Sequence, residues 1–203
     1  MKARINERFE IDGPAGQIEV VITDPGEGRR GYAIVAHPHS LHGGTLDNKV
    51  VQTLAKAFHS LGYAAVRFNF RGVGKSDGVF DDGGGELDDL LEVERFANSR
   101  FGDVEKVLAG FSFGSFVAAT AAGQLDPRYL VLVGPAVGRF PLGAVRKDTL
   151  VIHGEQDDIV ALGDVLDWAR PQQIPVIVFP GTGHFFHGVL IDLQNLITRL
   201  CRD

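Results

Sequence analysis

The stretch KVLAGFSFGSFVAATAAG, residues 106–123, is the one on which the fold prediction depends. An apolar, strand-like run ends at Gly110, and a helix rich in small residues follows almost at once. Between them lies GFSFG, residues 110–114, a Gly-x-Ser-x-Gly sequence. Turning from strand to helix within three residues strains the central residue, and small neighbours two positions away leave room for it. We therefore predict that Ser112 stands clear of a sheet edge as a nucleophile, where the helix N-terminus favours an oxyanion.

Outward from this turn, short runs rich in Val, Ile and aromatic residues alternate with longer stretches of helical period, which is typical of an α/β protein. Residues 4–12 and 17–24 are predicted to form an antiparallel N-terminal hairpin. Other apolar runs are predicted to be interior strands of a parallel sheet, because such strands are covered on both faces. These strands are predicted at 31–37, 63–70, 104–110, 128–134, 149–154 and 175–180. Helices are predicted at 46–62, 85–100, 115–125, near 161–170 and from about 185.

The predicted fold is a mostly parallel sheet of about eight strands with helices on both faces. The chain has 203 residues, 44% of them hydrophobic, which is enough to bury one substantial core, so residues 1–203 are read as a single domain. Only fifteen residues, 134–148, separate two of the predicted strands, and this gap leaves no room for a cap domain.

Charge and cysteine content narrow the class of partner. A formal net charge of −6 argues against nucleic acid, which requires clustered Lys and Arg, and favours a small molecule. Cys201 is the only cysteine, so no internal disulfide is possible and a cytoplasmic protein is expected. Residues 1–13 are rich in charge and contain no apolar block, so they are not expected to act as a signal peptide, and no run reaches the roughly 20 apolar residues of a membrane span. The sequence leaves a monomer and a homodimer both open.

The segment RFNFRGVGKSDG, residues 67–78, ends in letters that suggest a nucleotide-binding loop. A phosphate loop needs a glycine where this chain has Asn69, and it leads directly into a helix. Here Ser76 is followed by DGVFDDGGG, which is rich in helix-breaking residues. Lys75 would therefore lack a phosphate cradle, and we interpret the segment as a glycine-rich exit from a buried strand.

A serine hydroxyl needs a base and an orienting acid to become a nucleophile. His184 follows the last predicted strand in a glycine-flanked loop, and we predict that it is the base; His187 would share a helix face with it. The loop after the preceding strand offers Asp157, Asp158 and Glu155, of which we prefer Asp157 as the acid. All these loops leave the carboxyl edge of a parallel sheet, so the three groups can converge.

The chain order Ser112, Asp157, His184 resembles that of the α/β-hydrolase superfamily, and the resemblance covers nearly the whole chain. HPHSLHGG, residues 37–44, is similar to its His-Gly-x oxyanion segment, with Pro38 in place of the usual Gly. RFNFRGVGKS, residues 67–76, is similar to its Asp-x-Arg-Gly-x-Gly-x-Ser strand exit, with Asn in place of the Asp. Short carboxylesterases and dienelactone-hydrolase-like proteins resemble it most, although the latter characteristically carry Cys where this chain has Ser112.

The resemblance implies two backbone oxyanion donors, Phe113 and either His39 or Ser40. Ser40 and Phe185 are expected to contact the substrate, and Phe113 and Phe185 are candidates for an acyl pocket. The side chains of His37, His39 and His42 also suggest a metal site, but no carboxylate or thiolate completes it within the segment, so neither a metal nor a cofactor is expected.

These observations together predict a lidless serine hydrolase that cleaves small esters or thioesters through an acyl-enzyme on Ser112. Two alternatives stay open. One is a catalytically weak hydrolase-fold binding module, since a fold does not fix a function. The other is an amidase or peptidase, which we rank lower because such enzymes usually add a propeller or cap that this chain is too short to hold.

Overall fold

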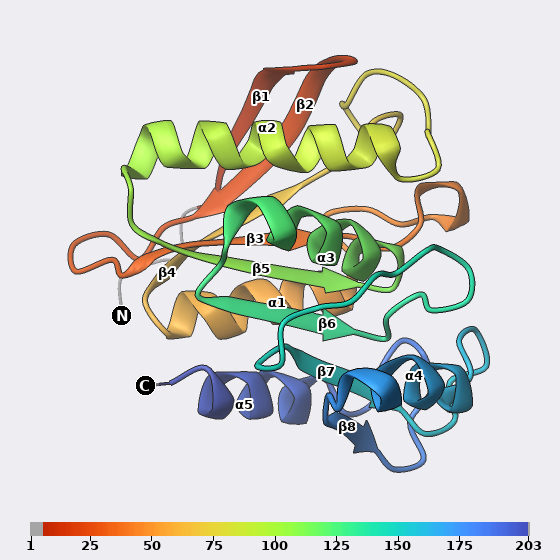
Figure 1. Ribbon diagram of the computed structural model, residues 1–203. Helices are drawn as coiled ribbons and strands as arrows, with labels where there is room; N and C mark the ends of the chain where they lie inside the picture. The colour runs from red at the N-terminus through yellow and green to blue at the C-terminus, as the bar shows by residue number, and fades with distance from the viewer. Residues whose placement is uncertain (1–5, 203) are drawn as a thin grey trace.

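The computed structural model describes residues 6–202, which form one eight-stranded sheet with α-helices packed around it (Figure 1). The strand order is β1-β2-β4-β3-β5-β6-β7-β8. Strands β3 to β8 run parallel to one another, whereas β1 pairs antiparallel with β2 and β2 antiparallel with β4. The strands are β1 (Asn6–Gly13), β2 (Gly16–Thr23), β3 (Gly31–Ala36), β4 (Tyr63–Phe68), β5 (Glu105–Phe111), β6 (Tyr129–Val133), β7 (Leu150–Gly154) and β8 (Val176–Phe179).

The predicted fold class is confirmed by this sheet and by its helices. The N-terminal hairpin matches the predicted one closely, although residues 4 and 5 of the prediction lie outside the described residues. Five α-helices are described, and each lies within or beside a predicted range. They are α1 (Lys49–Ser60), α2 (Gly84–Phe101), α3 (Phe113–Leu125), α4 (Leu162–Ala169) and α5 (Leu190–Leu200), with short 3-10 turns at Ser40–His42 and Arg170–Gln172.

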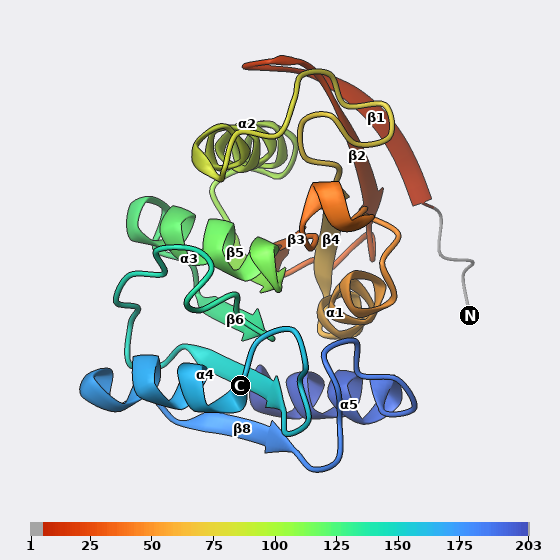
Figure 2. The same ribbon diagram turned by 90° about the vertical axis from the view of Figure 1, so that its right-hand side faces the viewer.

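Two helical layers cover the sheet (Figure 2). Helices α2 and α3 cover one face of the sheet and bury its side chains, such as Leu108 and Leu132. Helix α4 covers the β7 end of that same face. Helices α1 and α5 bury the opposite face around Phe58, Phe111 and Ile197. Each helix buries apolar side chains against a sheet that is apolar on both faces, and this burial holds the layers together.

Strand β3 lies between β4 and β5, so the chain winds in opposite directions from this point. It passes from β3 through α1 to β4 on one side, and later through α2 to β5 on the other. In α/β sheets, a crevice opens at the carboxyl ends of the strands where the winding reverses. The loops after β3 and β5 therefore leave the sheet next to each other, and these loops carry His39 and Ser112.

Two sequence predictions need correction. Residues 175–180 were expected to be an interior strand, but β8 is the edge strand and all of its residues are half-buried. The last helix begins at Leu190 rather than near residue 185, because Phe186 has a φ of 53° and Gly188 a φ of 82°, and neither fits a right-handed helix. The apolar letters fit an edge strand as well as an interior one, and a loop as well as a helix. Only the tertiary packing decides between these alternatives.

The connection between β6 and β7 contains no helix. Residues Val137 and Phe140 form an isolated bridge, and the ring of Trp168 on α4 donates a hydrogen bond to the Leu142 carbonyl at 3.1 Å. The segment is therefore a braced loop, as expected for a connection that is too short to hold a cap domain.

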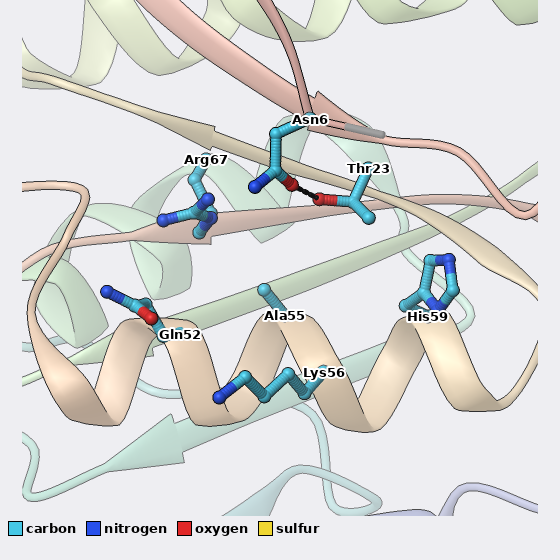
Figure 3. A pocket seen from close by; sticks show the side chains of 7 residues that line it. All are labelled: Asn6, Thr23, Gln52, Ala55, Lys56, His59 and Arg67. Carbon is cyan, nitrogen blue, oxygen red and sulfur yellow. Dashed lines mark hydrogen bonds between the residues drawn. The ribbon is translucent and has the colours of Figure 1, made fainter. Parts of the chain in front are cut away.

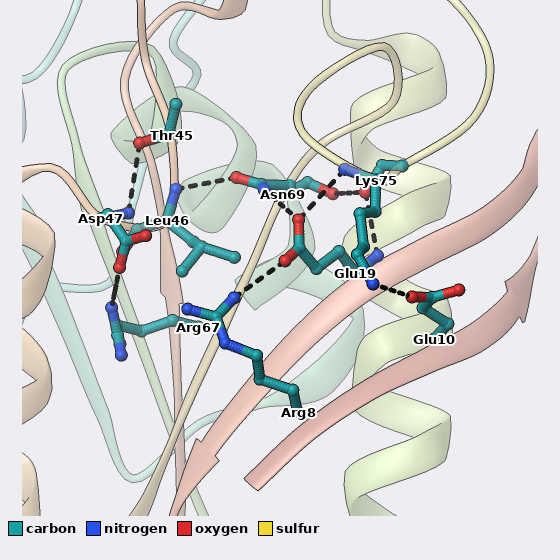
Figure 4. A network of polar contacts seen from close by, with 10 residues as sticks. Arg8, Glu10, Glu19, Thr45, Leu46, Asp47, Arg67, Asn69 and Lys75 are labelled. Atoms are coloured by element: carbon teal, nitrogen blue, oxygen red, sulfur yellow. Dashed lines mark hydrogen bonds and ion pairs between the residues drawn. The ribbon is translucent and has the colours of Figure 1, made fainter. Parts of the chain in front are cut away.

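The segment that resembles a nucleotide-binding loop encloses a carboxylate of the chain itself (Figure 4). The Lys75 N–H and the Asn69 amide both donate to Glu19 Oε2, at 3.1 and 2.7 Å, and Arg8 pairs with the other oxygen at 2.9 Å. Burial by itself raises the pKa of Glu19, but these donors outweigh it and hold the pKa below its ordinary value. The Lys75 ammonium contacts Glu10 at 2.6 Å. The donors of this loop thus anchor β2 to the exit of β4.

Among residues 6–202, none of the helices has both the length and the apolar character that crossing a membrane requires.

Candidate active site

The turn between β5 and α3 places Ser112 in a strained conformation. Its φ is 55° and its ψ is −119°, a combination that favours glycine over residues with a Cβ. A Cβ at Gly110 would lie 2.1 Å from the Gly114 carbonyl oxygen, and one at Gly114 would lie 2.3 Å from the Ala36 carbonyl oxygen. Both glycines are therefore required by close backbone approach, as the sequence suggested. The Ser112 N–H donates to the Val133 carbonyl at 2.9 Å, which ties the turn to β6.

Three side chains from separate loops meet at the carboxyl edge of the sheet. The Ser112 hydroxyl lies 3.0 Å from His184 Nε2, and His184 Nδ1 lies 2.6 Å from Asp157 Oδ2. These loops follow β5, β8 and β7 respectively. All three residues are buried, with 8%, 3% and 8% of Ser112, His184 and Asp157 exposed. The structure thus brings together the three residues that the sequence proposed as nucleophile, base and acid.

Asp157 is held as an ionised carboxylate. Its Oδ1 accepts the N–H groups of Ile159 and Val160 at 2.9 and 2.8 Å, while Oδ2 faces His184. Burial alone raises the pKa of this carboxyl, but the hydrogen bonds from His184 and the two amides, together with the charge interaction with His184, leave the pKa below its ordinary value. An ionised Asp157 accepts the Nδ1 proton of His184, so Nε2 is left as the acceptor for the Ser112 hydroxyl.

The other two acidic candidates lie elsewhere. Asp158 is exposed. Glu155 accepts the Gly181 N–H at 2.7 Å, so it braces the loop that carries His184. His187 does not share a helix face with His184 as predicted, because α5 has not yet begun; it is exposed and its ring stacks on Phe185 with centroids 5.9 Å apart.

A second buried histidine contacts the acid and was missed by the sequence reasoning. His153 Nε2 lies 2.9 Å from the Val160 carbonyl and 3.4 Å from Asp157 Oδ2. Its Nδ1 is buried and has no hydrogen-bond partner among the residues that the structure describes. Burial lowers the pKa of His153, which favours the neutral ring. The signal was available, since His153 is the one polar residue in the otherwise apolar strand β7.

The loop after β3 approaches the nucleophile. His39 contacts Phe113 with ring centroids 5.3 Å apart. Neither the His39 N–H nor the Phe113 N–H donates a hydrogen bond to another described residue, so both amides are free for an oxyanion. Ser40 was expected to contact the substrate, but it is not among the residues that line the cavity at Ser112. Its hydroxyl is buried and has no hydrogen-bond partner within residues 6–202. The chain turns into a 3-10 helix at Ser40, so His39 lines the cavity instead.

His37 anchors this loop to the exit of β4. Its Nδ1–H donates to the Pro38 carbonyl at 2.6 Å and its Nε2 accepts the Phe70 N–H at 3.0 Å, which fixes the neutral tautomer. The side chain is fully buried, and burial lowers its pKa to about 4. The neutral ring therefore holds Pro38, the residue that departs from the family pattern, against the sheet.

We expect the free energy of unfolding to fall as the pH is lowered from about 6.5 to about 4. An unfolded histidine takes up its proton near pH 6.5, whereas folded His37 does so only near 4, so the unfolded state binds more protons between these values. The stabilisation is complete above pH 6.5, and the loss by pH 4 is on the order of 3 kcal/mol. Denaturant unfolding at a series of pH values measures it.

His37→Gln should make this dependence shallower, with a remainder of the same sign from the lowered pKa values of His39 and His153. His187→Gln, at an exposed histidine, should leave the dependence as in the wild type. A His37 imidazole that titrates near pH 6.5 in the folded protein by NMR would contradict the assignment.

The reactive edge opens into a cavity of about 310 Å³. Ser112 and His184 line it, together with the rings of His39, Phe113 and Phe185. Phe113 is fully buried and Phe185 is 44% exposed, so the first belongs to the inner wall and the second to the mouth. The remaining lining residues are Pro38, His42, Gly43, Gly44, Asn48, Ala136, Arg139, Phe140 and Ile159.

A smaller cavity of about 110 Å³ lies between α1 and strands β2 and β4 (Figure 3). Its lining includes Arg67, which pairs with Asp47 at 3.1 Å, and Asn6, which accepts a hydrogen bond from Thr23 at 2.6 Å. It shares no lining residue with the cavity at Ser112. Among the described residues, no three His, Cys, Asp or Glu side chains are grouped so as to hold a metal ion.

The sheet topology and the geometry at Ser112 are those of the α/β serine hydrolase fold without a lid. The family model described as serine aminopeptidase, S33, matches residues 35–143, more than half of the chain, and the chain belongs to this family within the α/β-hydrolase superfamily.

Three similar proteins support this membership. A lidless α/β serine hydrolase from Xanthomonas campestris is 39% identical, with a TM-score of 0.91 over 96% of this chain and 93% of that one. An α/β serine hydrolase homologue from Coxiella burnetii is 42% identical, with a TM-score of 0.91 over 99% of this chain and 100% of that one. An uncharacterized protein of Rickettsia prowazekii (strain Madrid E) is 30% identical over 200 residues, which cover 87% of this chain and 80% of the relative.

Proposed function

We propose that this protein is a serine hydrolase that cleaves small carboxylic esters or thioesters, with Ser112, His184 and Asp157 as its catalytic triad. The observation that carries the proposal is the continuous hydrogen-bonded chain from the Ser112 hydroxyl through His184 to Asp157, at 3.0 and 2.6 Å. A buried, ionised carboxylate that fixes the tautomer of a histidine, which in turn contacts a strained serine, is the arrangement that activates a hydroxyl for acyl transfer.

The reaction proceeds in two steps. The Ser112 oxygen attacks the substrate carbonyl while His184 Nε2 takes the hydroxyl proton, and the resulting oxyanion is held by the N–H groups of Phe113 and His39. His184 then returns this proton to the leaving alcohol or thiol, which leaves an acyl group on Ser112. Water enters, gives a proton to His184 and attacks the acyl carbon, and the carboxylic acid leaves as Ser112 recovers its proton.

The size of the cavity favours small substrates. Its volume of about 310 Å³ lies at the lower end of the range for small-molecule sites, and the β6–β7 connection supplies no lid to cover a long chain. We expect kcat/KM for p-nitrophenyl esters to be greatest for short acyl chains and to fall as the chain grows beyond the cavity. A series of such esters, with acyl-CoA thioesters beside them, measures this, and faster hydrolysis of long-chain triglycerides would overturn it.

The description of the matched family makes aminopeptidase activity the second candidate. An aminopeptidase must hold the α-ammonium of its substrate, usually with a carboxylate, yet no Asp or Glu is among the described residues that line the cavity. Ester hydrolysis is therefore the first choice. Parallel assays with L-aminoacyl p-nitroanilides separate the two, since an aminopeptidase would turn these over faster than the short esters.

A binding module that has lost catalysis is separated from an enzyme by a fluorophosphonate probe. The probe reacts covalently with an activated serine and leaves an inactive one unmodified. Absence of labelling in folded protein would favour the module.

A further inference from the structure

Arg139 is the one Lys or Arg among the described residues that line the cavity at Ser112. No Asp or Glu lines this cavity within the described chain. The charge balance of the cavity is therefore opposite to that of the whole protein, whose formal net charge is −6. A local cation in an acidic protein attracts an anionic ligand to the site and disfavours a cationic one.

No carboxylate of residues 6–202 is paired with the guanidinium of Arg139. Many arginines of the described chain are paired with a carboxylate, as Arg71 is with Asp89 at 2.8 Å and Arg29 with Asp24 at 2.8 Å. Arg139 is exposed and forms no ion pair with any described residue. Its planar donors are thus free for a carboxylate, which they match in a bidentate manner.

The backbone of Arg139 is held in place beside the oxyanion region. The N–H groups of Arg139 and Phe140 both approach the Ala136 carbonyl, at 3.4 and 3.2 Å. The Phe140 ring packs against Phe113 with centroids 4.8 Å apart, and against Phe116 at 5.3 Å. Arg139 therefore belongs to a braced segment. It is next to Phe140, whose ring contacts Phe113, the residue that follows Ser112.

The positive charge of Arg139 affects the pKa of His39. Burial lowers the pKa of His39, and the nearby His42 and Arg139 lower it further, while Asp82 acts in the opposite direction. The His39 ring also lies 5.8 Å from the Phe140 ring. Both features place Arg139 on the side of the cavity where the oxyanion amides of His39 and Phe113 lie.

His184 belongs to a different aromatic group. Its ring lies 4.9 Å from Phe111 and 5.2 Å from Phe185, and no ring contact among the described residues joins this group to that of Phe140. Because His184 protonates the leaving group in the proposed reaction, the leaving alcohol belongs on the His184 side. The acyl part then extends past the oxyanion amides toward Phe140 and Arg139.

We propose that Arg139 selects esters whose acyl part carries a carboxylate, such as the half-esters of short dicarboxylic acids. This inference rests on the proposed function, and it adds a substrate class to it. The guanidinium binds the distal carboxylate while Ser112 attacks the ester carbonyl. The ester alcohol leaves by the His184 side, and the product is the free dicarboxylate.

Two matched pairs of substrates test the proposal and locate the charge. Monoethyl glutarate is compared with ethyl 4-carbamoylbutanoate, in which a neutral amide replaces the acyl carboxylate. Butanoyloxyacetate is compared with butanoyloxyacetamide, in which the change lies on the alcohol side. For the first pair we expect wild-type kcat/KM to favour the carboxylate about fivefold at low ionic strength, as for a solvent-exposed charge pair, and to lose this preference in 1 M salt. For the second pair we expect no preference for the carboxylate.

Arg139→Gln should bring the acyl-side ratio to about one, and Arg139→Glu should invert it. The matched control is Arg170→Gln, which removes the same charge at an exposed position outside the cavity and should keep the wild-type ratio. A wild-type ratio near one, a ratio that survives in Arg139→Gln, or a preference seen only on the alcohol side would overturn the proposal.

These failures differ from failure of the proposed function. If neutral esters are hydrolysed and Ser112 is labelled by a fluorophosphonate, the protein is a serine esterase whatever the ratio. If neither occurs, the proposed function itself is wrong, and the charge selection falls with it.

Discussion

Ser112→Ala is expected to lower kcat/KM for short p-nitrophenyl esters by about 10⁴- to 10⁶-fold, as loss of a triad serine does elsewhere. Without the hydroxyl no acyl-enzyme can form, and only the oxyanion donors and substrate binding remain. Steady-state kinetics measure the loss, and fluorophosphonate labelling should disappear with it. Ser99→Ala, at an exposed serine of α2, is the control and should retain both. Retention of more than a few per cent of activity in Ser112→Ala would show that the nucleophile lies elsewhere.

The same position also allows a test of backbone strain. The φ of 55° at Ser112 strains any residue with a Cβ, and glycine adopts this conformation without that cost. Both Ser112→Gly and Ser112→Ala remove the contact with His184, so the difference between them reports the backbone and the Cβ methyl rather than the lost hydrogen bond. We expect Ser112→Gly to have a free energy of unfolding about 1 kcal/mol higher than Ser112→Ala. Equal stability in denaturant unfolding would mean that the turn is relaxed.

Asp157→Asn is expected to lower kcat by about 10³- to 10⁴-fold, a loss of the size seen for the serine-protease acid. The N–H groups of Ile159 and Val160 both donate to one oxygen of this side chain, so they will keep the oxygen of the new amide. The NH₂ group must then face His184 Nδ1, which forces the ring proton onto Nε2. A protonated Nε2 cannot accept the proton of the Ser112 hydroxyl, so the base is lost while the fold is kept.

The adjacent residue provides a matched control for this substitution. Asp158→Asn makes the same chemical change at an exposed side chain and should alter kcat by less than about twofold. Steady-state kinetics of both variants, with thermal unfolding to check that each is folded, complete the test. Similar losses in the two variants would refute the assignment of Asp157 as the acid.

Much of the candidate site could be predicted from the sequence because its signals are local. The turn around Ser112 requires small residues at positions 110 and 114, and the printed letters meet that requirement directly. Apolar runs of strand length, separated by helical stretches, predicted a parallel sheet, and such a sheet brings the loops after its strands to one edge. The convergence of Ser112, Asp157 and His184 followed from that rule without any knowledge of distances.

The errors arose where tertiary packing decides between equally plausible local structures. The residues after His184 were expected to begin a helix, but Phe186 instead adopts a φ of 53°. Its ring is buried in the core on the face of the sheet that α1 and α5 cover. Nothing in the letters near Ser40 shows that its hydroxyl is excluded from the cavity. Arg139 was passed over because it acquires its role from residues such as Ser112 and Phe113, which lie far away in the chain. His153 contacts Asp157 and Val160, which are only four and seven residues away, but the letters do not show that its ring turns toward them.

The sequence by itself determined the class of fold, the strained serine and the chain order of the three reactive residues, since these depend on backbone sterics and on hydrophobic period over short windows. Only the tertiary structure decided which atoms meet: that Asp157 rather than Asp158 faces His184, that His37 holds the loop after β3, and that Arg139 brings to the cavity a charge that no carboxylate of the described chain pairs with. The physical reason is that hydrogen bonds and charge interactions act over a few ångströms between residues that the sequence separates by tens of positions. Their partners are fixed only when the layers pack.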